Sequence, residues 1–182
     1  MSTWTIDSTH SEVTFSARHM MITTVRGKFA NVTGSIELDE TETDITGGRI
    51  QIGIGSLTTG VDSRDEHLRS GDFFDVANHP EATYEVRGVR RLDGTEFEVV
   101  GDLTIKGVTR AVPLRAEFLG FYSSMQGARR LGVSASGRFD RSAFGLNWNV
   151  ALETGGWLVS DEVRLSIEVA LEVVSAAVSV AA

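Results

Sequence analysis

Apolar and polar residues alternate with a period of two along most of this chain. The clearest runs are residues 96–105 and 163–173, in which one face is apolar and the other is mostly charged. The expected inward residues are Phe97, Val99, Gly101, Leu103 and Ile105 in the first run, and Val163, Leu165, Ile167, Val169, Leu171 and Val173 in the second. Successive strand residues point to opposite faces, so each run predicts a β-strand with one dry side.

Weaker alternation covers six further stretches, which brings the predicted total to about eight strands. These stretches are residues 4–20, 25–39, 48–58, 83–92, 110–120 and 130–140. Asp93-Gly94 and Lys106-Gly107 suit tight hairpin turns, so consecutive strands should pair as antiparallel neighbours. Long strands with one apolar face are best closed into a barrel, which has no exposed edge. We therefore predict an all-β, eight-stranded antiparallel barrel, with a two-sheet sandwich as the alternative.

One segment, residues 61–80, departs from the strand pattern. It places Asp, Arg, Glu and His around two adjacent phenylalanines, Phe73 and Phe74. Two large rings in a short helical insert must bury against other apolar groups. We predict that the insert caps one end of the barrel with both rings turned inward. The rings would then serve either as a simple plug or as the wall of a ligand channel.

Length and charge limit the classes of function. The 182 residues fit one domain, predicted over residues 1–174 and followed by a frayed tail over 175–182. A net charge of −8 without a basic run argues against nucleic-acid binding. The absence of cysteine excludes a disulfide framework. The amino end shows no signal peptide and the apolar carboxyl end is too short to cross a bilayer, so we expect a cytoplasmic protein without a transmembrane segment.

Several motifs, in this order, resemble the YceI family. They are Trp4-x-Ile6-Asp7-x-x-His10-Ser11, His19, Gly27-x-Phe29, Thr59-Gly60-x-x-x-Arg64-Asp65-x-His67-Leu68, Phe73-Phe74-Asp75, His79-Pro80, Gly101-x-Leu103-Thr104-x-x-Gly107-Val108-Thr109, Arg141-x-x-Phe144-Gly145 and Asp161-x-Val163. The resemblance implies an extended lipocalin-like barrel that carries a long-chain isoprenoid, such as a quinone or a polyprenyl phosphate. Many relatives are exported, whereas this chain lacks their signal peptide.

From the resemblance and the inward faces we predict a set of ligand-binding residues. They are Phe15, His19, Phe29, Leu57, Arg64, His67, Leu68, Phe73, Phe74, Tyr84, Leu103, Val133, Phe144, Trp148 and Ile167. Arg64, together with Arg26 or Arg141, could meet the head group, because arginine offers a planar fork of donors. Trp148 and Trp157 belong to a long loop that lies either at the mouth or in a surface cluster. No resident cofactor is expected apart from the bound lipid.

The histidines offer little support for catalysis or metal binding. His10 and Ser11 are adjacent, so in a strand they point to opposite faces. The chain contains no G-x-S-x-G pattern, and its four histidines lack metal-ligand spacing. We therefore expect a non-catalytic protein without metal. The alternatives are an enzyme for a small hydrophobic substrate, with His10, His19 and Asp7 as acid-base groups, and a fully packed stress-response module. The sequence leaves open whether the chain forms a homodimer.

Overall fold

The computed structural model describes residues 1–123 and 127–173. The strands are β1 (Ser2–Ile6), β2 (Glu12–His19), β3 (Thr23–Phe29), β4 (Val32–Leu38), β5 (Ile45–Gly53), β6 (Leu57–Thr58), β7 (Glu81–Asp93), β8 (Glu96–Ile105), β9 (Val108–Ser123), β10 (Arg129–Asp140) and β11 (Val159–Val173). The helices are α1 (Asp62–Arg69) and the 3-10 turns η1 (Ser8–His10), η2 (Ile54–Ser56) and η3 (Arg141–Phe144). The predicted tail over 175–182 lies outside the described residues.

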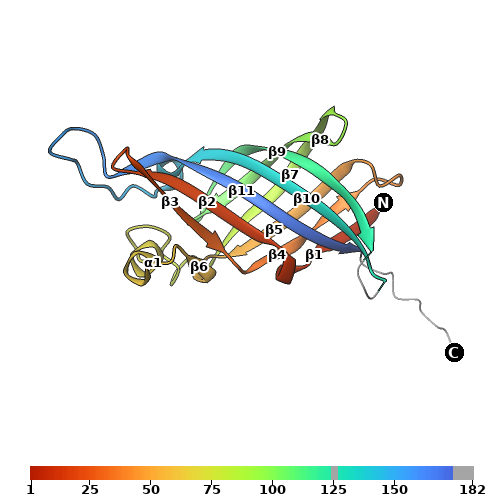
Figure 1. Cartoon of the computed structure of the whole chain (residues 1–182), viewed down its shortest axis with the longest axis horizontal. Helices are drawn as coiled ribbons and strands as arrows, with labels where there is room; N and C mark the ends of the chain where they lie inside the picture. Colours follow the sequence, from red (N-terminus) through yellow and green to blue (C-terminus); the bar gives the residue numbers. More distant parts are fainter. Residues whose placement is uncertain (124–126, 174–182) are drawn as a thin grey trace.

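All strand pairings are antiparallel, and they close into a barrel (Figure 1). The sheet runs β1-β4-β5-β7-β8-β9-β10-β11, and β11 returns to β1 through the pairs Trp4↔Val173 and Ile6↔Leu171. The other half of β11 pairs with β2, which continues to β3 and β6. The predicted eight-stranded antiparallel barrel is therefore confirmed, and the two-sheet sandwich is wrong.

Three of the eight predicted strands are each broken once. η1 separates β1 from β2, residues 30–31 separate β3 from β4, and η2 separates β5 from β6. At the first break, the Ser11 hydroxyl takes the place of a backbone partner and accepts a hydrogen bond from the Ala170 N–H at 3.1 Å. A buried N–H without a partner would be costly, so this hydroxyl lets the wall bend without losing a bond.

The inward faces follow the predicted alternation. Phe97, Val99, Gly101, Leu103 and Ile105 are all buried in β8. In β11 the predicted residues from Val163 to Leu171 are buried or half-buried, whereas Val173 is 37% exposed where the strand ends. Period-two alternation therefore places the core inside the barrel.

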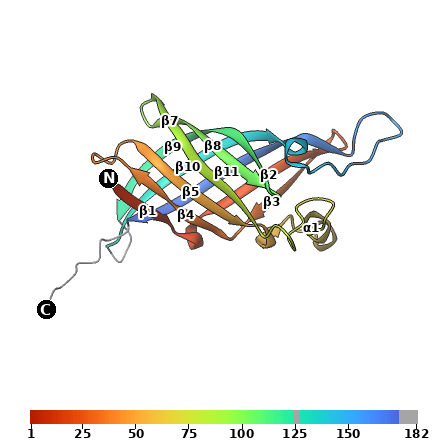
Figure 2. The same ribbon diagram turned by 180° about the vertical axis from the view of Figure 1, so that it is seen from behind.

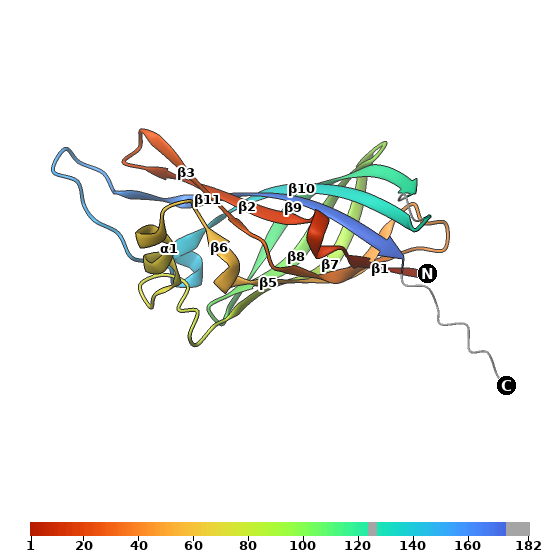
Figure 3. The ribbon, with the colours of Figure 1, turned by 60° about the horizontal axis from the view of Figure 1, so that its bottom comes forward.

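The two ends of the barrel differ. At the end that carries the N-terminus, Trp4, Phe97, Leu131 and Leu171 are fully buried and pack the interior. At the other end lie α1, β6 and the loop between η3 and β11, as the view from behind also shows (Figure 2). Figure 3 shows α1 beneath the β2–β3 hairpin and this loop, so the predicted helical cap is confirmed.

Neither α1 nor the 3-10 turns of the described residues have the length and apolar character that a membrane-spanning helix requires.

Candidate functional site

A cavity of about 120 Å³ lies inside the capped half of the barrel. Its walls come from inward residues of the strands, closed by residues of the cap and of the loop before β11. They are Val13, Phe15, Ala17, Phe29, Ile50, Ile52, Ile54, Leu68, Phe73, Phe74, Ala82, Tyr84, Leu103, Ile105, Val112, Leu114, Phe139, Arg141, Leu146, Val159, Val163, Leu165 and Ile167. The surface that this cavity presents is apolar.

Tyr84 contributes one of the two polar side chains in this wall. It is buried, and its hydroxyl donates to the Val112 carbonyl oxygen at 2.9 Å. Burial raises the pKa of Tyr84, so the phenol stays neutral. The ring lies directly over Gly101, where a β-carbon would stand 2.4 Å from the Tyr84 Cζ atom. A glycine at this position thus lets the ring lie flat on β8 and turn its hydroxyl away from the cavity.

Arg141 contributes the other polar side chain, and its guanidinium is occupied by the protein. Nε donates to the Ser160 carbonyl at 2.9 Å, and Nη1 donates to the carbonyls of Leu146 at 2.5 Å and Trp148 at 3.0 Å. Nη2 also lies 3.2 Å from a carboxylate oxygen of Asp161. The guanidinium holds the loop onto the barrel, and all three of its nitrogens are engaged by protein oxygens. It cannot offer a pair of donors to a ligand, so the hypothesis of a head-group role for Arg141 is wrong.

A second space of about 330 Å³ opens beside the first, between α1, the β2–β3 hairpin and the loop before β11. We call it the mouth. It is lined by Phe15, Ala17, Arg18, His19, Val25, Ser63, Arg64, His67, Leu68, Phe73, Trp148, Leu158 and Val159. Five of these residues also line the interior cavity, namely Phe15, Ala17, Leu68, Phe73 and Val159. The two spaces are therefore neighbours, separated by shared side chains.

Arg64 is positioned at the mouth by a short chain of hydrogen bonds. Its Nε donates to the Thr59 hydroxyl at 2.7 Å, and that hydroxyl donates to the Asp65 carboxylate at 2.5 Å. Burial by itself would raise the pKa of Asp65, but the hydrogen bonds from Thr59 outweigh it and the pKa is lowered. Asp65 therefore stays ionised and keeps both groups in place.

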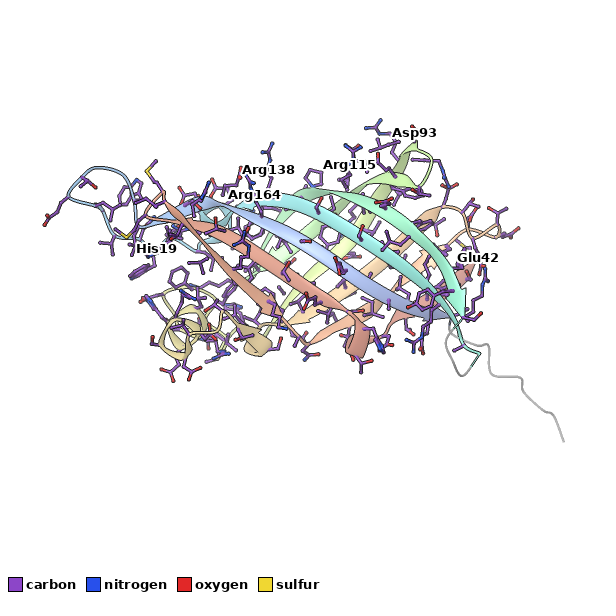
Figure 4. The ribbon with its side chains drawn as sticks, viewed as in Figure 1. His19, Glu42, Asp93, Arg115, Arg138 and Arg164 are labelled. Atoms are coloured by element: carbon purple, nitrogen blue, oxygen red, sulfur yellow. The ribbon has the colours of Figure 1, made fainter. Side chains whose placement is uncertain are left out.

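The mouth carries cationic and titratable nitrogen groups but no carboxylate in its lining. Besides Arg64 these are Arg18, His19 and His67. His67 bonds Asp72 through Nε2 at 2.9 Å and meets the Trp148 ring edge-on, with ring centroids 4.6 Å apart. Figure 4 shows His19 at this end of the molecule. The arrangement suits an anionic or hydrogen-bond-accepting group.

Aromatic rings form the partition between the mouth and the interior. Phe15 packs on Phe29 with centroids 5.4 Å apart, and Phe29 meets Phe74 edge-on at 6.0 Å. On the mouth side, Phe73 and Trp148 lie 5.4 Å apart. A molecule that passed from the mouth into the barrel would have to displace some of these rings.

Comparison with known proteins places this barrel in a family. The family model described as the YceI-like domain matches residues 4–171. A UPF0312 protein of Staphylococcus aureus is 36% identical over 165 residues, which cover 90% of this chain and 94% of the relative. This chain belongs to the YceI-like family.

Solved structures share the YceI-like fold. A Campylobacter jejuni YCEI protein aligns with a TM-score of 0.74 at 29% identity, over 85% of this chain and 88% of that one. Burkholderia cenocepacia BcnA aligns with a TM-score of 0.77 at 20% identity, over 91% of this chain and 98% of that one. A polyisoprenoid binding domain from Saccharophagus degradans aligns with a TM-score of 0.70 at 17% identity, over 96% of this chain and 100% of that one. At such identities the last two show the fold alone.

Most of the residues predicted to bind a ligand lie on one of the two spaces of this YceI-like barrel. Phe15, Leu68 and Phe73 line both, Phe29, Phe74, Tyr84, Leu103 and Ile167 line the interior, and His19, Arg64, His67 and Trp148 line the mouth. Leu57, Val133 and Phe144 line neither and are buried in the packed core, where Phe144 meets Phe139 edge-on. Arg26 is exposed on β3 and does not line the mouth, so the structure does not place it beside Arg64 where the head group was expected.

Sequence reasoning missed several wall residues that its own pattern could have supplied. Val163 and Leu165 share the inward face of Ile167 in β11, and Ile105 shares the face of Leu103. The mouth residues Ser63 and Leu158 carry no such signal, because they lie outside the strand pattern.

Of the three acid-base groups of the alternative enzyme, Asp7 and His10 lie together and His19 lies apart from them. His10 lies on η1 outside the barrel, bonded through Nδ1 to the Asp7 carboxylate at 2.7 Å, whereas His19 lies at the mouth where β2 ends. In the part of the chain that the structure describes, no three histidine or acidic side chains gather as a metal site. Asp7 and His10 instead belong to a surface cluster with Arg130, whose Nη1 is 3.1 Å from the Asp7 carboxylate.

This surface cluster leads to a prediction about pH. Hydrogen bonds from Thr9 and then His10 lower the pKa of Asp7 to about 2. Because the folded pKa lies below the ordinary value of about 3.9, Asp7 stabilises the fold above pH 4 and this contribution disappears between about pH 4 and 2. Asp7→Asn should reduce the free energy of unfolding by about 1–2 kcal/mol at pH 7 and by almost nothing near pH 2.

Urea unfolding of both proteins at several pH values measures this difference. Glu168→Gln, on the exposed face of β11, is the control and should stay within about 0.5 kcal/mol at every pH. A destabilisation by Asp7→Asn that persists undiminished at the lowest pH would contradict the assignment.

Proposed function

We propose that this protein binds a long-chain isoprenoid lipid, with the prenyl chain inside the barrel and the head group at the mouth, and that it carries the lipid without chemical change. The observation that carries this proposal is an apolar interior next to a mouth lined by Arg18 and Arg64 and by no carboxylate. The S. degradans neighbour, called a polyisoprenoid binding domain, supports the same reading.

The hydrophobic effect supplies the affinity in this proposal. Each methylene transferred from water to an apolar wall contributes about 0.8 kcal/mol, so a prenyl chain needs few polar contacts to be held. The wall offers no free polar group to solvate, because Tyr84 and Arg141 are bonded to backbone carbonyls. Nor does the wall present a nucleophile aimed at the cavity, which is consistent with carriage rather than turnover.

The interior must enlarge to accept such a chain. Its volume is about 120 Å³, whereas an engineered apolar cavity of about 150 Å³ holds one benzene. The present interior thus accommodates about one isoprene unit. Entry of a longer chain requires Phe15, Phe73 and Phe74, which lie between the two spaces or on the cap, to swing aside.

The mouth favours a phosphate over a quinone head group. Arg64 is held by Thr59 through Nε and through a contact of Nη2 with the Thr59 carbonyl at 3.1 Å, and among the described residues no carboxylate pairs with its guanidinium. A phosphate would find a charged donor there, whereas a neutral quinone gains only an ordinary hydrogen bond.

The experiment adds a polyprenyl phosphate or a ubiquinone to delipidated protein and records native mass spectra. We expect a complex of one lipid per chain and release of the unchanged lipid on extraction. Arg64→Gln should weaken phosphate binding about tenfold, in keeping with the strength of hydrogen bonds to charged groups, and should leave quinone binding unaltered. Arg26→Gln, on the outside of β3, is the matched control and should change neither.

Each alternative gives a different result. Failure of both lipids to bind would overturn carriage and favour the packed stress-response module. Recovery of a chemically altered lipid would favour an enzyme. Equal loss of phosphate binding in Arg64→Gln and Arg26→Gln would retain carriage but remove Arg64 from the head-group site.

A further inference from the structure

The turn between β2 and β3 places three exposed apolar side chains at the outer end of the barrel. Met20 is 44% exposed, Met21 74% and Ile22 75%. We call these three residues the hairpin tip. The turn lies at the end opposite the N-terminus (Figure 1), beside the loop that precedes β11.

The loop adds a tryptophan next to the hairpin tip. Trp157 is 58% exposed. The residues on either side of Trp157 hold the loop against the turn. The Met20 N–H donates to the Leu158 carbonyl at 2.7 Å, and a β-carbon on Gly156 would stand 3.0 Å from the Met21 sulfur. The backbone around Trp157 therefore lies against the hairpin tip. Leu158 lines the mouth, whereas the exposed Trp157 side chain lies on the other face of the loop, beside Asn147, Asn149 and Asp161.

The backbone of the turn is unfavourable for the residues that occupy it. Met20 and Met21 have φ of 51° and 59°, and the Ile22 N–H bonds the His19 carbonyl at 3.1 Å. Turns with positive φ at both central positions strongly prefer Asn-Gly. Here two methionines occupy these positions instead of Asn-Gly. Both side chains are exposed, so burial in the core does not explain their presence in this strained turn.

Charge distinguishes the hairpin from the cap across the mouth, because residues 61–80 carry five carboxylates and two arginines. The hairpin between residues 17 and 26 carries Arg18 and Arg26 and no carboxylate, and the loop between residues 143 and 160 carries only Glu153, although the whole chain has a net charge of −8. Arg18 reaches the tip itself, where its Nη1 donates to the Ile22 carbonyl at 3.3 Å. A cation beside exposed methionine and isoleucine side chains is typical of a surface that enters the interface of an anionic bilayer.

We infer that the hairpin tip and Trp157 dock this protein on an anionic lipid bilayer, with the β2–β3 hairpin pointing toward the membrane. A stable interface with a second protein needs about 800 Å² from each partner, which one turn and one indole do not supply. A bilayer requires only that a few apolar side chains enter it, and tryptophan is enriched at that depth. The inference goes beyond isoprenoid binding and does not depend on it.

The test is co-sedimentation of delipidated protein with vesicles of equal parts phosphatidylcholine and phosphatidylglycerol, compared with phosphatidylcholine alone. We expect binding to the anionic vesicles and a blue shift of tryptophan fluorescence that Trp157→Phe removes. The double variant Met20→Asn/Met21→Gly should lose at least about tenfold in vesicle partition, since two apolar side chains leave the contact. Its thermal stability should stay equal or rise, because Asn and Gly suit positive φ.

The matched control is Leu119→Ser, which removes an apolar side chain that is 62% exposed on β9 and should leave vesicle binding unchanged. Two results would overturn the inference: no binding by the wild-type protein, or equal binding by the double variant. Sedimentation velocity gives a third, because a wild-type dimer that the double variant dissociates would assign the tip to a second copy. Docking without isoprenoid uptake would overturn only the proposed function.

Discussion

Replacing Arg141 with methionine should lower the free energy of unfolding by about 3–5 kcal/mol, because it leaves buried carbonyls without their donor. Burial lowers the pKa of Arg141, with opposing effects from Asp161 and Asp140, yet an arginine stays charged at neutral pH. Its guanidinium joins η3 to residues 146–160, the loop that carries Trp148 to the mouth. Urea unfolding monitored by circular dichroism gives the stability.

Two further variants separate this role from a general effect of charge. Arg138→Met removes a side chain that is 75% exposed and paired with Glu162 at 3.7 Å, so it should stay within about 0.5 kcal/mol of the wild-type protein. Arg141→Lys should recover only part of the loss, because one ammonium cannot reach the carbonyls of Leu146, Trp148 and Ser160 together. Similar losses for Arg138→Met and Arg141→Met would refute the role of Arg141 in holding the loop.

The barrel could be predicted from the sequence because alternation is clear in long strands such as β8 and β11. Alternate residues of β8, from Phe97 to Ile105, lie inward as expected. The hairpin turns make consecutive strands antiparallel neighbours. The phase of the alternation changes across η1, from Trp4 and Ile6 to Val13 and Phe15, but the contact that closes this break could not be predicted. It joins Ser11 to Ala170, which is 159 residues away in sequence. Period two reports which face a residue occupies and carries no information about a distant partner.

The same limit explains why some of the predicted site residues line neither the interior cavity nor the mouth. Alternation identifies Val133 as inward, but the height of a residue along the barrel depends on the stagger of the strands, and Val133 pairs with Val169 away from the cavity. Arg141 was misread for a related reason. Its acceptors are loop carbonyls, and every residue has a carbonyl, so no side-chain pattern marks them.

Phe73→Ala should have two effects that a change in the packed core cannot reproduce together. Phe73 is buried, with its ring 5.1 Å from that of His67, yet it lines both the interior and the mouth. Because part of the ring already faces empty space, we expect the lipid-free protein to lose roughly 2–3 kcal/mol, less than the 3–5 kcal/mol typical of a fully packed phenylalanine. Affinity for the prenyl chain should fall, because the chain loses a wall.

Phe97→Ala is the matched comparison, since Phe97 is fully buried against Phe118 and lines neither space. It should cost about 3–5 kcal/mol with or without lipid and leave affinity unaltered. A tenfold weaker affinity reduces the stabilisation by saturating lipid by about 1.4 kcal/mol, so thermal unfolding with and without a bound polyprenyl phosphate distinguishes the two variants. If Phe73→Ala lost the same stability in both states at unchanged affinity, the ring would only plug the barrel. A loss below about 1 kcal/mol at unchanged affinity would place the ring at the surface, and the cap could not gate a lipid channel.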